Sequence, residues 1–341
     1  MLDPGFLPGG VHPPYGCEMD TRTANPPTPI AASSAAISAR GLRKIYAATK
    51  KAPAKEALKG IDLDVPRGSI FGLLGPNGAG KSTFINILAG LVKKTAGSAT
   101  VWGFDIDRNP RQSRAAIGVV PQEINMDVFF TPKEALEIQA GLYGVPKPER
   151  RTMEILEALG LSDKADAYVR MLSGGMKRRL LVAKAMVHAP PVLILDEPTA
   201  GVDIELRKQL WHYVVGLNRS GVTIVLTTHY LEEAQELCDR IAIIHEGCVV
   251  ACEPTEKLIA SFDNKSLLVT PLEPLNAAPA LAPYAAELKD GRLIIPYQPS
   301  KAQVADILER LSEAGVKVKD LTTVEPDLED VFLELTYRSG R

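Results

Sequence analysis

Eight consecutive residues have the types and spacing needed to bind phosphate. They run Gly75-Pro76-Asn77-Gly78-Ala79-Gly80-Lys81-Ser82 and fit the pattern G-x-x-x-x-G-K-[ST]. The glycines let the backbone curl so that successive N–H groups point at one phosphate, and a following helix adds its N-terminal dipole. Lys81 would then reach the β- and γ-phosphates of a nucleotide, and Ser82 would bind Mg²⁺. The pattern predicts a phosphate-binding loop; a glycine-rich turn that only connects strand to helix is the alternative.

Two adjacent carboxylates could serve the same chemistry. Asp196 and Glu197 follow the apolar run Val192-Leu193-Ile194-Leu195, which predicts a buried strand that ends in two acids. At that position Asp196 could hold Mg²⁺, directly or through water. Glu197 could accept a proton from an attacking water, a role worth roughly 10²–10⁴ in rate. A pair of solvated acids is the alternative, which the phosphate-binding loop makes less favoured.

Composition and missing motifs exclude several classes of protein. The 39 Lys and Arg residues against 41 Asp and Glu residues give a net charge of -2, so a broad basic field for nucleic acid is absent and only a local patch is possible. No apolar run reaches the ~18–20 residues of a membrane span. The four cysteines form no C-x-x-C pair, which argues against zinc and for reduced thiols in the cytoplasm. A guanine-reading N-K-x-D motif is missing, because Asn264-Lys265-Ser266-Leu267 lacks the aspartate.

The elements that must position these residues follow an alternating pattern. Apolar strand candidates at Ile70–Leu74, Val192–Leu195 and Val222–Thr227 alternate with helical stretches, among them Thr83–Leu91. Near-continuous apolar strands of this kind indicate a mainly parallel sheet that is covered on both faces. Two strand candidates flank Glu246-Gly247 and predict a hairpin. The fold class is therefore α/β.

Three further segments complete the organisation of the chain. Residues 1–36 are rich in Pro, Gly, Ala and Ser and predict a disordered tail, with Met19 as a possible alternative start. Residues 37–261 form the α/β domain, into which a helical subdomain of about 124–190 is inserted; Thr131-Pro132-Lys133-Glu134 reads as a capping box there. Residues 262–341 predict a small C-terminal α+β domain with a hairpin around Asp290-Gly291 and an amphipathic helix over Ala302–Ala314.

A third motif connects the first two to a known family. Leu172-Ser173-Gly174-Gly175-Met176 places Ser173 23 residues before Asp196. With the phosphate-binding loop and the Asp-Glu pair, this order resembles the ATP-binding subunit of an ABC transporter over about residues 38 to 255. Within that family, the run from Met171 to Leu180 and the run LILDEPTAGVDIELR are very similar to ATPases of ABC-2 type exporters, in the YadG-like, drug-exporter branch.

The resemblance implies a fold and a set of site residues. The implied fold is a P-loop NTPase (RecA-like) core with an antiparallel β subdomain and a helical insert, plus the small C-terminal domain. The implied cofactors are ATP and Mg²⁺. The nucleotide-binding residues would be Tyr46, which would stack on adenine, the loop from Gly75 to Ser82 with Thr83, the signature residues Ser173, Gly174 and Gly175, and Asp203. The Mg²⁺ ligands would be Ser82, Gln122 and Asp196, and the catalytic residues Glu197, Gln122 and the switch histidine His229. For Tyr46 and His229 a purely structural role is the alternative.

The same resemblance implies partners. Ser173 and Gly175 would grip the γ-phosphate of ATP held by a second copy, so ATP would close a head-to-tail homodimer. A separate ABC-2 type integral membrane permease would supply the transport path, and the chain would lie at the cytoplasmic face of the inner membrane. Phe129-Phe130 is a candidate contact with that permease; the alternative is that both rings lie in the core of the insert.

Several further features of the sequence allow more than one interpretation. The Lys177-Arg178-Arg179 cluster predicts an exposed helix face with acidic or backbone partners, rather than a nucleic-acid site. The segment Ala47–Ala57 is unusually long and basic around Tyr46. The C-terminal domain, whose segment Glu325–Phe332 resembles the closing motif of drug-exporter ATPases, would support the dimer, regulate it or only add stability. A soluble ABC ATPase acting on nucleic acid or ribosomes, or an importer motor, is the alternative function.

Overall fold

The computed structural model describes residues 34–48, 50, 53–199, 202, 204–263, 265–281 and 283–338. They form two compact units that divide between Cys252 and Glu253. The division falls ahead of residue 262, where the sequence places the second domain. The physical reason is α8 (Thr255–Ala260), which contacts α10 (Leu328–Arg338) near the other end of the second unit. The predicted tail lies outside the described residues.

The central feature of the first unit is a six-stranded sheet. Its strands, in spatial order, are β10 (Cys248–Pro254), β9 (Arg240–His245), β3 (Ile70–Leu74), β8 (Thr223–Thr227), β7 (Val192–Asp196) and β6 (Ile117–Val120). β3 pairs in parallel with β8 and β9, and β7 pairs in parallel with β6 and β8. The parallel sheet predicted from the apolar runs is confirmed. Glu246 and Gly247 link the neighbouring strands β9 and β10 with positive φ angles of 47° and 81°.

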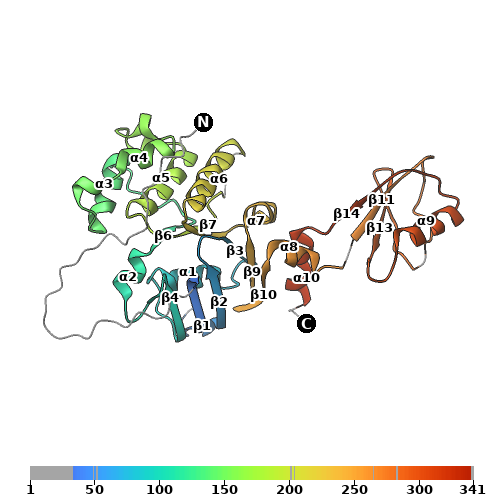
Figure 1. Cartoon of the computed structure of the whole chain (residues 1–341), viewed down its shortest axis with the longest axis horizontal. Helices are drawn as coiled ribbons and strands as arrows, with labels where there is room; N and C mark the ends of the chain where they lie inside the picture. Colours follow the sequence, from blue (N-terminus) through green and yellow to red (C-terminus); the bar gives the residue numbers. More distant parts are fainter. Residues whose placement is uncertain are drawn as a thin grey trace. The chain divides into compact units, whose positions relative to one another are not determined.

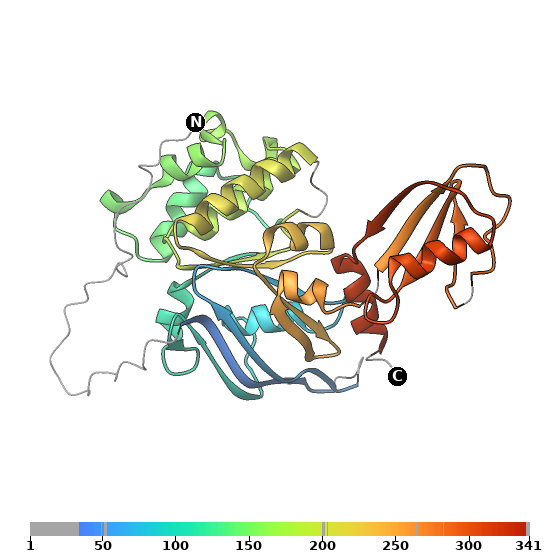
Figure 2. The same ribbon diagram turned by 45° about the vertical axis from the view of Figure 1, so that its right-hand side comes forward.

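A second, antiparallel sheet of the first unit encloses one helix. Its spatial order is β2 (Lys55–Pro66), β1 (Ala35–Tyr46), β4 (Ala96–Val101) and β5 (Phe104–Asp105). Helix α1 (Lys81–Leu88) lies between the two sheets, as Figures 1 and 2 show. Its side chains Phe84, Ile85, Ile87 and Leu88 are buried in one core with residues of both sheets. A helix that is apolar around most of its circumference needs such cover on several sides.

Helices cover the other side of the six-stranded sheet. α3 (Pro132–Leu142), α4 (Thr152–Ala158), α5 (Gly174–Met186) and α6 (Ile204–Arg219) lie there (Figures 1 and 2). The predicted capping box is confirmed, since Thr131 Oγ1 accepts from Glu134 N at 3.2 Å and Glu134 Oε2 accepts from Thr131 N at 2.8 Å. Three short 3₁₀ turns join these helices: Lys147–Glu149, Ser162–Lys164 and Val169–Met171. Helices α2 (Pro110–Ala115) and α7 (Leu231–Leu237) complete the first unit.

The second unit has a core of its own. Its sheet has the order β12 (Glu287–Lys289), β13 (Arg292–Tyr297), β11 (Lys265–Pro271) and β14 (Val318–Val324), and its pairs are antiparallel. Helix α9 (Val304–Glu313) packs Ile307 and Leu311 into the same core as Leu267 and Val269 of β11. None of the helices in the described part of the chain combines the length and apolar character that a bilayer crossing requires.

Candidate functional site

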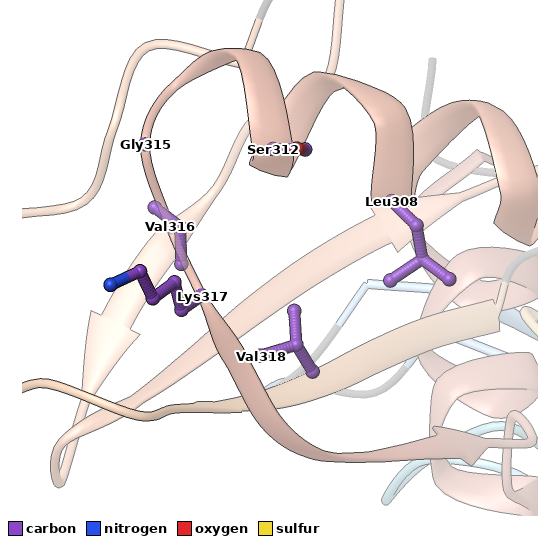
Figure 3. A pocket seen from close by; sticks show the side chains of 6 residues that line it. All are labelled: Leu308, Ser312, Gly315, Val316, Lys317 and Val318. Atoms are coloured by element: carbon purple, nitrogen blue, oxygen red, sulfur yellow. The ribbon is translucent and has the colours of Figure 1, made fainter.

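Two hollows in the surface differ in their chemistry. The hollow of about 510 Å³ in the second unit is lined by Leu308, Ser312 and the segment Gly315–Val318. Figure 3 shows Leu308 of α9 and Val318 of β14 at its walls, with the Lys317 side chain reaching away from both. The hollow of about 190 Å³ in the first unit is lined by Tyr46, Lys55, Ala57, Asn77, Gly78, Ala79, Gly80, Lys81, Ser82, Thr83, Gln122 and Glu197. Of these two, only the hollow in the first unit brings ionisable groups together with a glycine-rich loop, so it is the candidate site.

The glycine-rich loop connects β3 to α1, as the motif requires. Gly75 has a φ angle of 154°, and a Cβ atom on it would lie 2.1 Å from the backbone oxygen of Ile244. Gly80 is the N-cap of α1 with a φ angle of 116°, and a Cβ atom there would lie 2.7 Å from the backbone oxygen of Ala57. Glycine is therefore required at both positions, because a side chain there would collide with the neighbouring backbone. They fix the loop between strands that come from distant parts of the chain.

The Lys81 side chain is buried beneath this loop. Its Nζ donates to the backbone oxygen of Gly75 at 2.6 Å and to that of Pro76 at 3.3 Å. Burial lowers the pKa of the Lys81 ammonium group, while the nearby carboxylates of Glu197 and Asp196 oppose that shift. The carbonyl contacts hold the ammonium group at the start of the loop, where it faces the site.

Glu197 occupies the centre of the site. It follows β7 with a φ angle of 50°, a left-handed conformation that is rare for a residue with a side chain. Its backbone N–H donates to the backbone oxygen of Thr227 at 3.1 Å and to Thr227 Oγ1 at 3.0 Å. The buried carboxylate meets two predicted site residues: Gln122 Nε2 donates to Oε2 at 2.6 Å, and His229 Nε2 lies 2.5 Å from Oε1. Three residues that are far apart in the sequence thus meet at one carboxylate.

Asp196 and Ser82 have the donor chemistry that Mg²⁺ prefers. Thr227 Oγ1 donates to Asp196 Oδ1 at 2.5 Å and so fixes this carboxylate at the end of β7. Within the described residues, no group of three or more His, Cys, Asp or Glu side chains could hold a metal by itself. Mg²⁺ is typically held by one or two protein oxygens together with waters and substrate phosphates.

Tyr46 borders the hollow from the end of β1. Its hydroxyl lies 3.5 Å from Thr83 Oγ1, and Lys44 Nζ lies 4.8 Å from the centre of its ring. The residue is 40% exposed. This exposure excludes a core tyrosine, which is one form of the structural alternative, and is compatible both with a surface tyrosine and with stacking on a flat ligand.

The signature residues lie apart from this hollow. Ser173 is the N-cap of α5, and its Oγ accepts from Met176 N at 3.2 Å. Ser173, Gly174 and Gly175 are not among the residues that line the hollow. Asp203 lies outside the described residues.

One buried arginine corrects an expectation from the sequence. Arg178 was expected on an exposed face of the helix, but only 4% of it is exposed. Its Nη1 donates to the backbone oxygens of Pro121 at 3.1 Å and Gln122 at 2.7 Å, because α5 packs against the end of β6. The backbone partners that were expected for the cluster are confirmed, and Arg179 also has one, the oxygen of Leu159 at 2.7 Å. Arg178 thus ties the helix of the signature residues to the segment that carries Gln122.

A buried glutamate that the sequence did not single out joins two further loops. Glu233 Oε2 accepts from Thr199 Oγ1 at 3.0 Å and from Thr228 Oγ1 at 3.3 Å. Its Oε1 lies 3.3 Å from Arg207 Nε of α6. Thr199 follows Glu197 by two residues and Thr228 precedes His229, so Glu233 connects the loops on both sides of the site. Its position four residues after His229 was the only signal in the sequence.

The aromatic pair in the helical insert is exposed. Phe129 is 70% exposed and Phe130 is 38% exposed. The alternative that both rings lie in the core of the insert is therefore wrong. Other large apolar side chains of the insert are exposed as well: Ile124, Val128, Ile138, Leu142, Met153, Tyr168 and Met171.

Comparison with known proteins places the chain in a family. The family model "ABC transporter" matches residues 58–200. The chain is 39% identical to the daunorubicin resistance ATP-binding protein DrrA2 of Streptomyces coeruleorubidus, over 83% of this chain and 91% of that protein. It is 36% identical to the linearmycin resistance ATP-binding protein LnrL of Bacillus subtilis, over 86% and 97%. It is 37% identical to the Nod factor export ATP-binding protein I of Ralstonia nicotianae, over 94% and 99%.

Solved structures show the same cassette. A structure of the ATP-binding subunit of an ABC transporter matches 66% of this chain and 92% of its own with a TM-score of 0.60 and 27% identity. A dimeric post-hydrolysis state of the ATP-binding cassette MJ0796, bound to ADP and Pi, matches 64% of this chain and 98% of its own with a TM-score of 0.58 and 26% identity. These curated relatives match over 91–99% of their length, and the glycine-rich loop and Glu197 line one hollow. The chain therefore belongs to the ABC transporter family, as one of its ATP-binding and ATP-hydrolysing subunits.

Proposed function

We propose that this chain is the motor subunit of an ABC-2 type exporter and drives transport through a separate membrane permease. The observation that carries the proposal is the near-full-length similarity to relatives named for drug resistance and Nod factor export, which covers 91–99% of their length. That similarity extends past the cassette into the second unit. The transported compound would be selected by the permease.

The proposed chemistry assigns one task to each side chain at the hollow. The loop Gly75–Ser82 binds the phosphates of ATP through its backbone N–H groups, and Lys81 neutralises their charge. Tyr46 stacks on adenine. Ser82, Asp196 and Gln122 would hold Mg²⁺, which supplies charge neutralisation at the β- and γ-phosphates.

Glu197 is the proposed general base. Its carboxylate accepts the proton of the attacking water, and His229 and Gln122 orient the groups around the γ-phosphate. The two contacts that Glu197 makes, with Gln122 Nε2 at 2.6 Å and His229 Nε2 at 2.5 Å, support this role because they fix both carboxylate oxygens.

The signature residues support a homodimer. Ser173–Gly175 stand at the N-terminus of a 13-residue helix, where free N–H groups and the helix dipole attract anions. They do not line the hollow of their own chain. We infer that they bind the γ-phosphate held by a second copy in head-to-tail orientation, and that Asp203 takes part in signalling between the two sites. ATP binding then shifts the population toward the closed dimer.

The exposed apolar side chains of the insert are the proposed contact with the permease. Phe129 is 70% exposed, Met171 73% and Leu142 78%. Apolar exposure on this scale within one subdomain is typical of an interaction surface. Docked there, the chain would lie at the cytoplasmic face of the inner membrane.

Purification of the tagged chain from native membranes tests the proposal. We expect an integral membrane protein with several spans to co-purify in mild detergent. Phe129→Asp should remove that partner and leave the basal ATPase rate of the free chain within about twofold. The matched control is Leu91→Asp, an equally exposed apolar side chain outside the insert, which should retain the partner. A chain that is recovered entirely free of membranes, in cells that express the neighbouring genes, would contradict the exporter assignment.

A further inference from the structure

One cation at the nucleotide hollow has no assigned task. Lys55 is the first residue of β2, within the basic segment noted around Tyr46, and it lies directly opposite Tyr46 in the β1–β2 pairing. Residues directly opposite each other in an antiparallel pair project to the same face of the sheet. Lys55, Tyr46 and Ala57 accordingly all line the hollow.

The Lys55 ammonium group points at the phosphate-binding loop. Its Nζ lies 3.8 Å from the position that a Cβ atom would have on Gly78, at the middle of the loop. Lys81 approaches the same loop from the other end, where its Nζ contacts the backbone oxygens of Gly75 and Pro76. The loop is therefore flanked by two ammonium groups, one buried and one exposed.

Lys55 is also available for a ligand. Among the residues that the structure describes, its ammonium group has no hydrogen-bond or ion-pair partner. Other exposed lysines nearby are engaged: Lys44 donates to the backbone oxygen of Lys93 at 2.8 Å and lies over the Tyr46 ring, and Lys59 lies 3.8 Å from Glu246 Oε2. Lys44 is thus the cation that lies over the Tyr46 ring, whereas the Lys55 ammonium group lies beside the phosphate-binding loop.

We propose that Lys55 is a second cationic ligand of the nucleotide phosphates, which approaches them from β2 opposite Lys81. An ammonium group beside a loop of inward-pointing N–H groups adds a charge-assisted hydrogen bond to the triphosphate. Because Lys55 is exposed, its side chain is free to turn onto the phosphates when ATP enters. The proposal rests on the assignment of the loop to the phosphates, and it does not depend on the exporter assignment.

Steady-state ATPase kinetics of Lys55→Ala test the proposal. The KM for ATP should rise about three- to tenfold, as expected for the loss of one charge-assisted contact at an exposed site, while kcat stays within about twofold. Lys55→Arg, which keeps the charge and the donors, should restore most of the affinity. The matched control is Lys59→Ala, an exposed lysine of the same strand outside the hollow, which should leave the KM unchanged.

Equilibrium binding separates the failure of this proposal from the failure of the loop assignment. ATP is titrated into the Glu197→Gln protein with and without Lys55→Ala, at low and at high ionic strength. Weaker binding and a smaller salt dependence in Lys55→Ala support the phosphate contact. An unchanged affinity in Lys55→Ala, or an equal loss in Lys59→Ala, overturns it. Lys81→Ala is included because an unchanged affinity in that variant would overturn the loop assignment itself.

Discussion

At the scale of single residues, the site depends on how one strained glutamate is held. Glu197 keeps a left-handed φ angle of 50°, a conformation that costs on the order of 1 kcal/mol or more for a residue with a side chain. The Glu197 backbone N–H, which donates to both the backbone oxygen and the Oγ1 of Thr227, helps to offset this cost. The strain aims the carboxylate into the hollow between Gln122 and His229. Backbone strain of this kind concentrates at functional sites.

Replacement of the Glu197 carboxylate by an amide tests the proposed base. We expect Glu197→Gln to bind ATP with an affinity close to that of the native protein and to lower kcat by at least 10², because the amide cannot take a proton from water. ATP should also convert this variant to a stable dimer. Single-turnover ATPase assays and size-exclusion chromatography with and without ATP provide the measurements. Brisk hydrolysis by the variant would exclude Glu197 as the base.

A buried histidine makes stability depend on pH. His188 stacks on Tyr143 with 3.7 Å between ring centres, and its Nε2 lies 3.2 Å from the backbone oxygen of Ile117. Burial lowers the pKa of His188 to about 4 from its ordinary value near 6.5. Between these two pH values His188 is protonated in the unfolded chain and neutral in the folded chain. The contribution of neutral His188 is therefore complete above about pH 6.5 and is lost as the pH falls to about 4.

Urea unfolding at several pH values measures this effect. His188 should lower the free energy of unfolding by about 3 kcal/mol between pH 6.5 and 4. His188→Phe keeps the aromatic stack and cannot titrate, so this part of the pH dependence should disappear. His212→Gln, which changes an exposed histidine on α6, is the control and should preserve it. An identical slope in the native protein and His188→Phe would show that His188 is not the titrating group.

At the scale of elements, α5 connects two functional segments. The signature residues stand at its N-terminus, and Arg178 on the same helix binds the backbone oxygens of Pro121 and Gln122. The helix also packs against β6, which leads into Gln122. A displacement of α5 would therefore move Gln122 relative to Glu197.

Removal of the Arg178 guanidinium tests this connection. Arg178→Met keeps the apolar stem and loses both hydrogen bonds, so Gln122 should lose its fixed position. We expect kcat to fall at least tenfold with a change of KM below about threefold. Lys177→Met, on the neighbouring position of the helix, should leave both constants unchanged. Loss of ATP binding in Arg178→Met, measured by titration, would instead indicate collapse of the hollow.

How far the sequence predicts this architecture depends on how local each feature is. The loop Gly75–Ser82 was predictable because its conformation is set by neighbouring residues and by the elements on each side. The contacts of Arg178 with Pro121 and Gln122, and of Glu233 with Thr199, were not, because they depend on segments 34 to 57 residues away that only the fold brings together. A charged residue within a basic run is predicted to be exposed unless the packing of its helix is known. The approach of Lys55 to the loop could not be predicted for the same reason, because Lys55 lies on β2 and only the fold brings the start of β2 close to Gly78.

At the scale of the whole molecule, the described residues form a separate apolar core in each of the two units. One holds α1 between two sheets, and the other holds α9 against β11 and β13. Each core is closed by residues of its own unit, and the hollow that contains the phosphate-binding loop is lined by residues of the first unit alone. We therefore expect ATP to stabilise one unit and not the other.

Calorimetry of the full chain tests the independence of the two cores. ATP at about 100 times its Kd should stabilise the first unit by roughly 2.7 kcal/mol and leave the second transition in place. Leu267→Ala, in the fully buried centre of β11, should lower the stability of the second unit by about 2–5 kcal/mol without changing the KM for ATP. One transition that responds to both changes would contradict two independent cores.

The two contacts on the Glu197 carboxylate have a consequence for how turnover depends on the conformation of the chain. Gln122 Nε2 donates to one oxygen and His229 Nε2 lies 2.5 Å from the other, and each oxygen keeps a lone pair for a hydrogen bond from water. Because Gln122 and His229 belong to segments that are far apart in the sequence, movement of either segment would change the direction from which water can reach the proposed base, and with it the rate of hydrolysis.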